Sequence, residues 1–172
     1  MAAERDPQRA ALGASRSLLG LLLGGGLLGA VVLAVSQFLN LYGTHIRVHH
    51  RLVATATAGS EHAYALLPVA IAAAVLAYGV WKVASRPALL GLGLLGLAAL
   101  LIALLHDLPY AHRQGLWNLG GHFVLAVNRP EIGLYAETAG ALLLLLTVVC
   151  GFVLLGSPEP HVREARGPLR TQ

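Results

Sequence analysis

Five polar residues stand near the ends of long apolar stretches, where such side chains are uncommon. They are Asn40, His62, His106, Asp107 and Glu137. Imidazole and carboxylate groups can exchange protons, bind a metal ion or pair with one another. Ionisable groups in or beside a membrane span are costly and often functional. These five residues are therefore the candidate polar cluster, which serves either a ligand or the structure alone.

The composition identifies the solvent in which these residues must work. Of the 172 residues, 56% are hydrophobic and 12% are charged, whereas a soluble domain is about 25% charged. A soluble chain of this size cannot bury so much apolar surface, so the composition indicates a membrane protein. The basic residues flank apolar segments, which suits membrane orientation better than binding of nucleic acid.

Four apolar segments are long enough to cross a bilayer as helices, which requires about 20 residues each. We expect them at about 18–39, 63–83, 88–105 and 132–155. Backbone polar groups in lipid must be paired within the segment, so the fold class is an all-α bundle of four transmembrane helices. The expected organisation is a basic tail, a transmembrane domain and a second basic tail, at 1–16, 17–156 and 157–172.

Arginine and lysine at the segment ends predict the orientation. One side carries eight of the twelve, namely Arg5, Arg9, Arg16, Lys82, Arg86, Arg163, Arg166 and Arg170. The other side carries four, namely Arg47, Arg51, Arg113 and Arg129. Both termini are therefore expected in the cytoplasm. The arginine-rich, Ala-, Leu- and Gly-rich composition favours a bacterial plasma membrane. A rival interpretation makes the first segment a cleaved signal peptide, although its apolar stretch exceeds the usual length of about 7–15 residues.

The two longer loops, 40–62 and 106–131, are then the outer loops. Polar and apolar residues alternate over 45–49, and branched residues alternate with alanine over 53–58. Phe123 to Val127 is a short β-prone run bounded by Gly120-Gly121 and Pro130. Such patterns are typical of strands. We expect the loops to form a small antiparallel sheet that caps the bundle.

Small residues recur on one face of each expected helix, and such faces pack against other helices. These faces comprise Gly26 and Gly29; Ala70, Ala73 and Ala77; Gly96, Ala99 and Ala103; and Gly140, Thr147 and Gly151. Continued toward the outer side, they lead to Asn40, His62, His106 and Glu137 respectively. The cluster is therefore expected to converge. Three interpretations stay open: a structural network at the membrane interface, a ligand or transport site, and a metal or haem site using His62 and His106.

The remaining motifs indicate no enzyme and no cofactor. His45, His49 and His50 are weak candidates for zinc or copper, because their spacing matches no specific zinc motif and a basic loop at lipid headgroups explains them better. Cys150 is the single cysteine, and there is no CxxC. No GxSxG or HExxH motif is present.

The topology resembles the claudin-type tetraspan arrangement, with four helices and a structured first outer loop. That loop here lacks the tryptophan and the paired cysteines of the family, so a role in tight junctions is not implied. The expected function is that of a non-enzymatic accessory or scaffold subunit acting through its outer face. The alternatives are a small transporter or channel subunit and a metal- or haem-binding protein. The expected partners are the lipid bilayer and a membrane protein or a second copy, but no nucleic acid.

Overall fold

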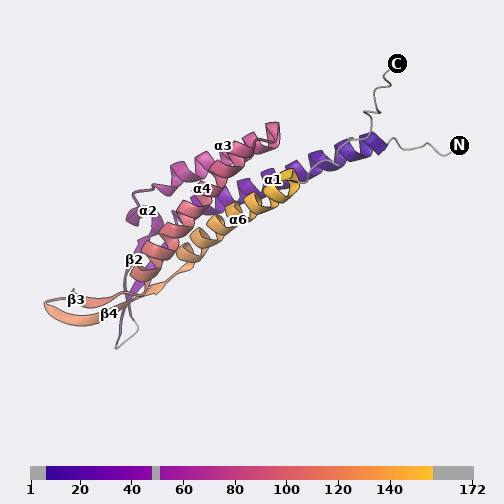
Figure 1. The fold of residues 1–172 in the computed structure, drawn as a ribbon. Coiled ribbons are helices and arrows are strands. Elements are labelled where there is room, and N and C mark those ends of the chain that lie inside the picture. The colour runs from indigo at the N-terminus through magenta and orange to yellow at the C-terminus, as the bar shows by residue number, and fades with distance from the viewer. Residues whose placement is uncertain (1–6, 48–50, 157–172) are drawn as a thin grey trace, which may run out of the picture.

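Four long helices and a four-stranded sheet make up the chain in a computed structural model, which describes residues 7–47 and 51–156 (Figure 1). The helices are α1 (Pro7–Ser36), α2 (Ala58–Glu61), α3 (Leu66–Val83), α4 (Arg86–Ile102), α5 (Leu108–Ala111) and α6 (Ile132–Gly156), with a π-helical turn η1 (Ala103–Asp107) between α4 and α5. The strands are β1 (Asn40–Ile46), β2 (Leu52–Thr57), β3 (Gln114–Leu119) and β4 (His122–Pro130).

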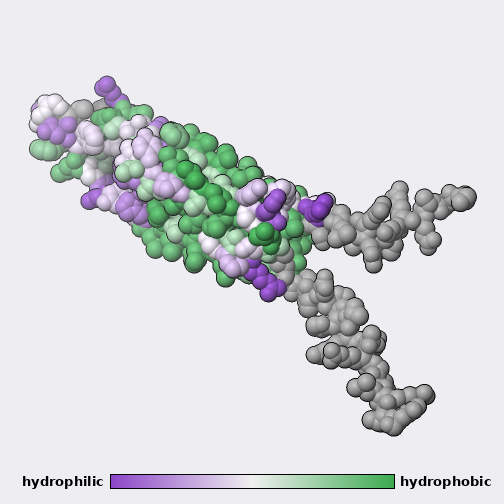
Figure 2. Space-filling model, turned by 90° about the horizontal axis from the view of Figure 1, so that it is seen from above, coloured by the Kyte–Doolittle hydropathy of each residue, from purple (hydrophilic) through white to green (hydrophobic). Residues whose placement is uncertain are grey.

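Four helical stretches are long and apolar enough to cross a membrane: 16–36, 66–83, 86–111 and 132–154. Many of their large apolar side chains point away from the bundle, and Figure 2 shows hydrophobic residues covering its flank. In water such a surface would aggregate, whereas hydrocarbon solvates it. The expectation of four apolar helices is therefore confirmed.

The helices pack through the small residues that the sequence placed on one face of each. α1 lies against α3 and α6, and α4 lies against the same two helices. A Cβ atom added at Gly26 would come within 2.6 Å of the Ala77 side chain, and one added at Gly140 within 2.8 Å of the Leu33 backbone nitrogen. Close packing of this kind holds helices together in lipid, where the hydrophobic effect does not.

The third helical stretch continues six residues beyond its expected end at Leu105. The π-helical turn η1 carries the chain through His106 and Asp107, and Pro109 then occupies the first turn of α5. A proline is tolerated there because its missing N–H has no essential partner in a first turn. The first helix instead ends early, at Ser36, so its expected end at Leu39 is wrong.

The expected small antiparallel sheet is confirmed, with the strand order β2-β1-β4-β3. Each of the two long loops contributes a hairpin, and the pairing of β1 with β4 joins them. The sheet lies at one end of the helices, which we call the sheet end, and the tight turn between α3 and α4 lies at the other (Figure 1). A small apolar cluster joins the sheet to the helices: Leu41 of β1 packs with Ala58, Ala111 and Leu134.

Candidate functional site

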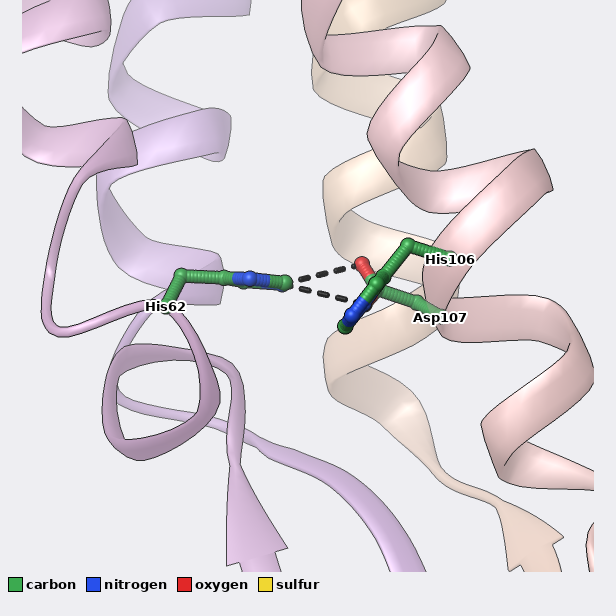
Figure 3. A group of neighbouring side chains, drawn as sticks. All are labelled: His62, His106 and Asp107. Carbon is green, nitrogen blue, oxygen red and sulfur yellow. Dashed lines mark hydrogen bonds and ion pairs between the residues drawn. The ribbon is translucent and has the colours of Figure 1, made fainter.

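Three side chains meet at the sheet end of the bundle: His62, His106 and Asp107 (Figure 3). The Nε2 atom of His62 lies 3.0 Å and 3.1 Å from the two carboxylate oxygens of Asp107. The Nδ1 atom of His106 lies 2.9 Å from Oδ1 of the same carboxylate. Both imidazole N–H groups can therefore donate to Asp107, which is only 1% exposed, while His62 is 11% and His106 52% exposed.

The turn between α2 and α3 positions His62. Thr57 and Ser60 form a capping box at the start of α2, and His62 follows as the residue that ends this short helix. Ala63 and Tyr64 then both adopt positive φ angles, of 48° and 58°. Left-handed backbone at non-glycine residues is strained and persists only where surrounding contacts impose it. One such contact is the Tyr64 ring, which lies tightly against Gly59.

The π-helical turn determines which residue of the third stretch points inward. Ala99, Ala103, Asp107 and Ala111 are all buried and spaced by four. In a continuous α-helix, a spacing of four drifts by about 40° at each step, since a turn takes about 3.6 residues. The wider π turn absorbs this drift. As a result, Asp107 and not His106 continues the buried face, which corrects the expectation that this face leads to His106.

Glu137 is buried beside this group and lies on α6. Neither of its carboxylate oxygens has a hydrogen-bond partner among the described residues. Its position follows from the antiparallel packing of α6 on α1, in which Gly133 approaches the Asn40 backbone and Gly140 approaches Leu33. Glu137, midway between the two glycines, therefore lies level with the end of α1.

Gln37 is a buried polar residue that the sequence-based selection missed. It directly follows α1, and neither atom of its side-chain amide has a partner within the described part of the chain. The signal was present, because Gln37 precedes the selected Asn40 by three positions and would share its face in a continuous helix. The helix ends before Asn40, however, so the two residues belong to different elements.

The charge of the cluster alters the titration of His62. The pKa of its imidazole is raised above the ordinary value, mainly by the hydrogen bond to Asp107. Burial acts in the opposite direction, while the negative charges of Asp107, Glu137 and Glu61 add to the rise. His62 therefore holds a proton more firmly than a free histidine does.

A second polar contact stands beside the cluster, between Tyr42 of β1 and Glu61 of α2. The Tyr42 hydroxyl donates a hydrogen bond of 2.8 Å to Oε1 of Glu61. Burial, followed by this hydrogen bond and the Glu61 charge, raises the pKa of Tyr42 to about 12. This bond ties the sheet to the segment that carries His62.

The other candidates lie apart from the cluster. Asn40 is the first residue of β1 and pairs with Thr57 of β2, so its place is in the sheet and not in one of the four long helices. His45 lies in β1, where it pairs with Leu52 of β2 on one side and with Val127 of β4 on the other. His49 and His50 fall outside the described residues. The structure thus brings together His62, His106 and Asp107, with Glu137 close by.

The arrangement suits a metal ion or a proton better than a haem. A haem with two axial histidines requires its plane to pass between the two rings. Here the ring centroids are 5.5 Å apart, and one Asp107 oxygen contacts both imidazoles. The carboxylate thus occupies the space that the haem plane would need.

Fold and site together define a helix-rich chain with four apolar helices, an antiparallel sheet at one end and a His–Asp–His group with a buried aspartate at that end. No family model matches the chain, and no match was found among curated proteins or solved structures. Its function must be argued from its own residues.

Proposed function

We propose that the chain is a non-enzymatic accessory subunit of a membrane protein assembly and that it binds its partner through the sheet. The observation that carries this proposal is the apolar surface of the β3–β4 hairpin. Leu116 is 73% exposed and Phe123 is 71% exposed. Lipid accounts for exposed leucines on the helices, but the hairpin extends beyond them (Figure 1).

The two exposed residues belong to one face of the sheet. Leu116 pairs with Leu125, and the neighbouring pair on that face joins Asn118 to Phe123. Directly opposed residues in an antiparallel pair share a face, so these side chains form one apolar strip. A strip of this kind on a protruding hairpin is typical of a surface that another protein covers.

Positive charge accompanies the strip and indicates the chemistry of the partner. Arg47 extends β1 beside the strip, because its backbone N–H donates to the carbonyl of Leu125. The side chain of Arg129 lies on the same face of β4 as that of Leu125, because the two residues are separated by an even number of positions in one strand. The matching partner surface is an apolar segment of another membrane protein, flanked by acidic side chains.

We propose further that this assembly resides in a bacterial plasma membrane, with both termini in the cytoplasm and the sheet outside. The support is the uneven number of arginine and lysine residues in the sequence segments that flank the four helices, eight in the two tails and the α3–α4 turn against four in the two loops that form the sheet. Short positively charged segments are retained on the cytoplasmic side.

Photo-crosslinking in the native membrane tests the partner proposal. A photoreactive residue at Leu116 or Phe123 should give one crosslinked product of defined mass, and the same product from both sites. The matched control is Leu94, an equally exposed residue that faces lipid on α4. A crosslinked product of twice the mass of the chain would replace the partner by a second copy. Monomer alone, or the same product from Leu94, would overturn the proposal.

A further inference from the structure

We infer that His62, His106, Asp107 and Glu137 form a binding site for a divalent first-row metal ion, with Zn²⁺ as the best match. This site is independent of the partner proposed above, since it lies between the helices and the sheet and not on the hairpin. Its donor set is two imidazole nitrogens and two carboxylates. Zn²⁺ accepts this combination, whereas Ca²⁺ and Mg²⁺ prefer oxygen ligands alone.

The spacing of the donors suits one ion. The donor atoms of His62, His106 and Asp107 all lie within 4.8 Å of one another. Zinc–ligand distances of about 2.0–2.2 Å place the ligands of a tetrahedral site about 3.3 Å apart. The nitrogen–oxygen contacts to Asp107 are 2.9–3.1 Å, so these two contacts need to lengthen by only a few tenths of an ångström. Glu137 lies outside this group of three and must move toward the ion to become the fourth ligand.

The buried charge supplies the second, independent argument. Glu137 is fully buried, and neither of its oxygens makes a hydrogen bond of good geometry among the described residues. Its carboxyl group interacts electrostatically with Asp107 and His62 and lies within hydrogen-bonding reach of Asp107, so it belongs to the same group. Two adjacent buried carboxylates cannot both carry their charge without a large penalty. A divalent ion would neutralise both carboxylates while the two histidines bind as neutral ligands.

One ligand of the site lies at the surface. Asp107 and Glu137 form its buried side, while the His106 side chain is 52% exposed. His106 is held in place by stacking on Tyr110, with ring centroids 5.0 Å apart. We therefore expect an ion to enter the site at His106.

The elements that contribute ligands give the ion a structural effect. His62 follows α2, His106 and Asp107 lie in η1, and Glu137 lies in α6. One ion would thus link three segments at the sheet end, including the strained turn at Ala63 and Tyr64. Bound metal would make the base of the sheet more rigid.

Metal titration of the full-length protein in detergent tests the site. After removal of metal with a chelator, Zn²⁺ affinity and stoichiometry are measured by competition with a chromophoric chelator. Co²⁺ is then used as a spectroscopic probe of tetrahedral geometry. The wild type should bind one Zn²⁺ per chain and give the intense visible absorption of tetrahedral Co²⁺. His62→Ala and His106→Ala should each weaken Zn²⁺ binding at least about 100-fold, since even outer-shell partners are worth about 10- to 100-fold.

Glu137→Gln keeps the shape of the side chain and removes its charge, so it tests the fourth ligand. It should weaken Zn²⁺ binding and change the Co²⁺ spectrum. Of these variants, His106→Ala is the one least expected to disturb folding, because this half-exposed residue can be truncated with little loss of packing. A loss of Zn²⁺ binding in it therefore reports on the ligand itself. Two controls should bind as the wild type does: His122→Ala, on the exposed hairpin, and the double change His49→Ala with His50→Ala. Absence of one-to-one binding, binding unaffected by His62→Ala and His106→Ala, or binding lost only in the His49/His50 variant would each overturn the site.

Discussion

Gly140 of α6 lies against the backbone of Leu33 in α1, with no room for a side chain between them. A Cβ atom at Gly140 would come within 2.8 Å of the Leu33 nitrogen and 3.1 Å of the Gly29 carbonyl oxygen. Both neighbours are backbone atoms, which cannot rotate away. The separation of the two helices, and with it the level of Glu137, therefore depends on this glycine.

Gly140→Ala should destabilise the protein by about 1–3 kcal/mol, the usual effect of overpacking. Thermal unfolding in detergent measures the change. Gly20→Ala is the matched control in α1, because a Cβ atom there meets nothing within 4 Å. Alanine also favours a helix over glycine, so this control should be neutral or slightly stabilising. Equal midpoints for the two variants would contradict the close approach of α1 and α6.

Ala84→Gly should stabilise the protein by about 0.5–1 kcal/mol. Ala84 ends α3 with a φ angle of 49°, a left-handed conformation that glycine adopts without steric penalty. Ala88→Gly, in the first turn of α4, should instead destabilise by about 1 kcal/mol. Unfolding midpoints of the two variants on opposite sides of the wild type check the prediction, and a loss of stability in both would refute it.

The His62–Asp107 hydrogen bond should stabilise the metal-free protein at low pH and lose that effect as pH rises. The pKa of His62 is raised in the folded state, so its contribution is complete below the unfolded value of about 6.5 and disappears above the raised value. His62→Gln should therefore reduce the unfolding midpoint more at about pH 6 than at about pH 9, in the presence of a chelator. His112→Gln is the control, because His112 bonds to the carbonyl of Leu108 and not to a carboxylate. A difference that grows with pH would contradict this contact.

Tyr42 should ionise well after an ordinary tyrosine. Its pKa of about 12 compares with about 10 for the unfolded chain. The folded state thus keeps the proton that the unfolded state loses, so this contribution to stability is complete below about pH 10 and is lost between about pH 10 and 12. The absorbance of tyrosinate, taken as wild type minus Tyr42→Phe, should rise near pH 12. A rise near pH 10 would show that Tyr42 is not buried against Glu61.

Cysteine labelling should reveal the orientation of the chain. In a Cys150→Ala background, an impermeant thiol reagent applied to intact cells should label Asn118→Cys, near the end of β3, and spare Lys82→Cys. Opening the membrane should then make Lys82→Cys reactive. The reverse pattern would invert the proposed topology. Cys150 must be removed first, because its side chain is exposed on the surface of the bundle.

The sequence was sufficient for features that depend on hydropathy and on regular periodicity. Four apolar stretches predicted four helices, and the small-residue face at Ala70, Ala73 and Ala77 is buried as expected. Alternating side chains predicted a sheet. The same periodicity predicted that His62 and His106 would converge; in the structure the two meet through Asp107.

The errors arose where the backbone departs from its regular period. The π-helical turn η1 places Asp107, in preference to His106, on the buried face. No residue type in that segment signals such a turn. The early end of α1 likewise separated Asn40 from Gln37. The sequence showed both polar residues, but it did not show that α1 ends before Gln37 and that β1 begins at Asn40.

The pairing of β1 with β4 has a consequence for the synthesis of the chain. Thr44 and Asn128, 84 positions apart, are joined by a side-chain hydrogen bond within this pair, and α1 likewise packs on α6. A ribosome delivers α1 and β1 long before their partners exist. Until β4 and α6 are made, the glycine-lined surface of α1 and one edge of β1 stay uncovered, open to insertion factors or chaperones. The hairpins and the packing of α3 on α1 and α4 can form earlier, whereas the contacts of α1 and α4 with α6 form last. The C-terminal helix is therefore the step that completes the fold.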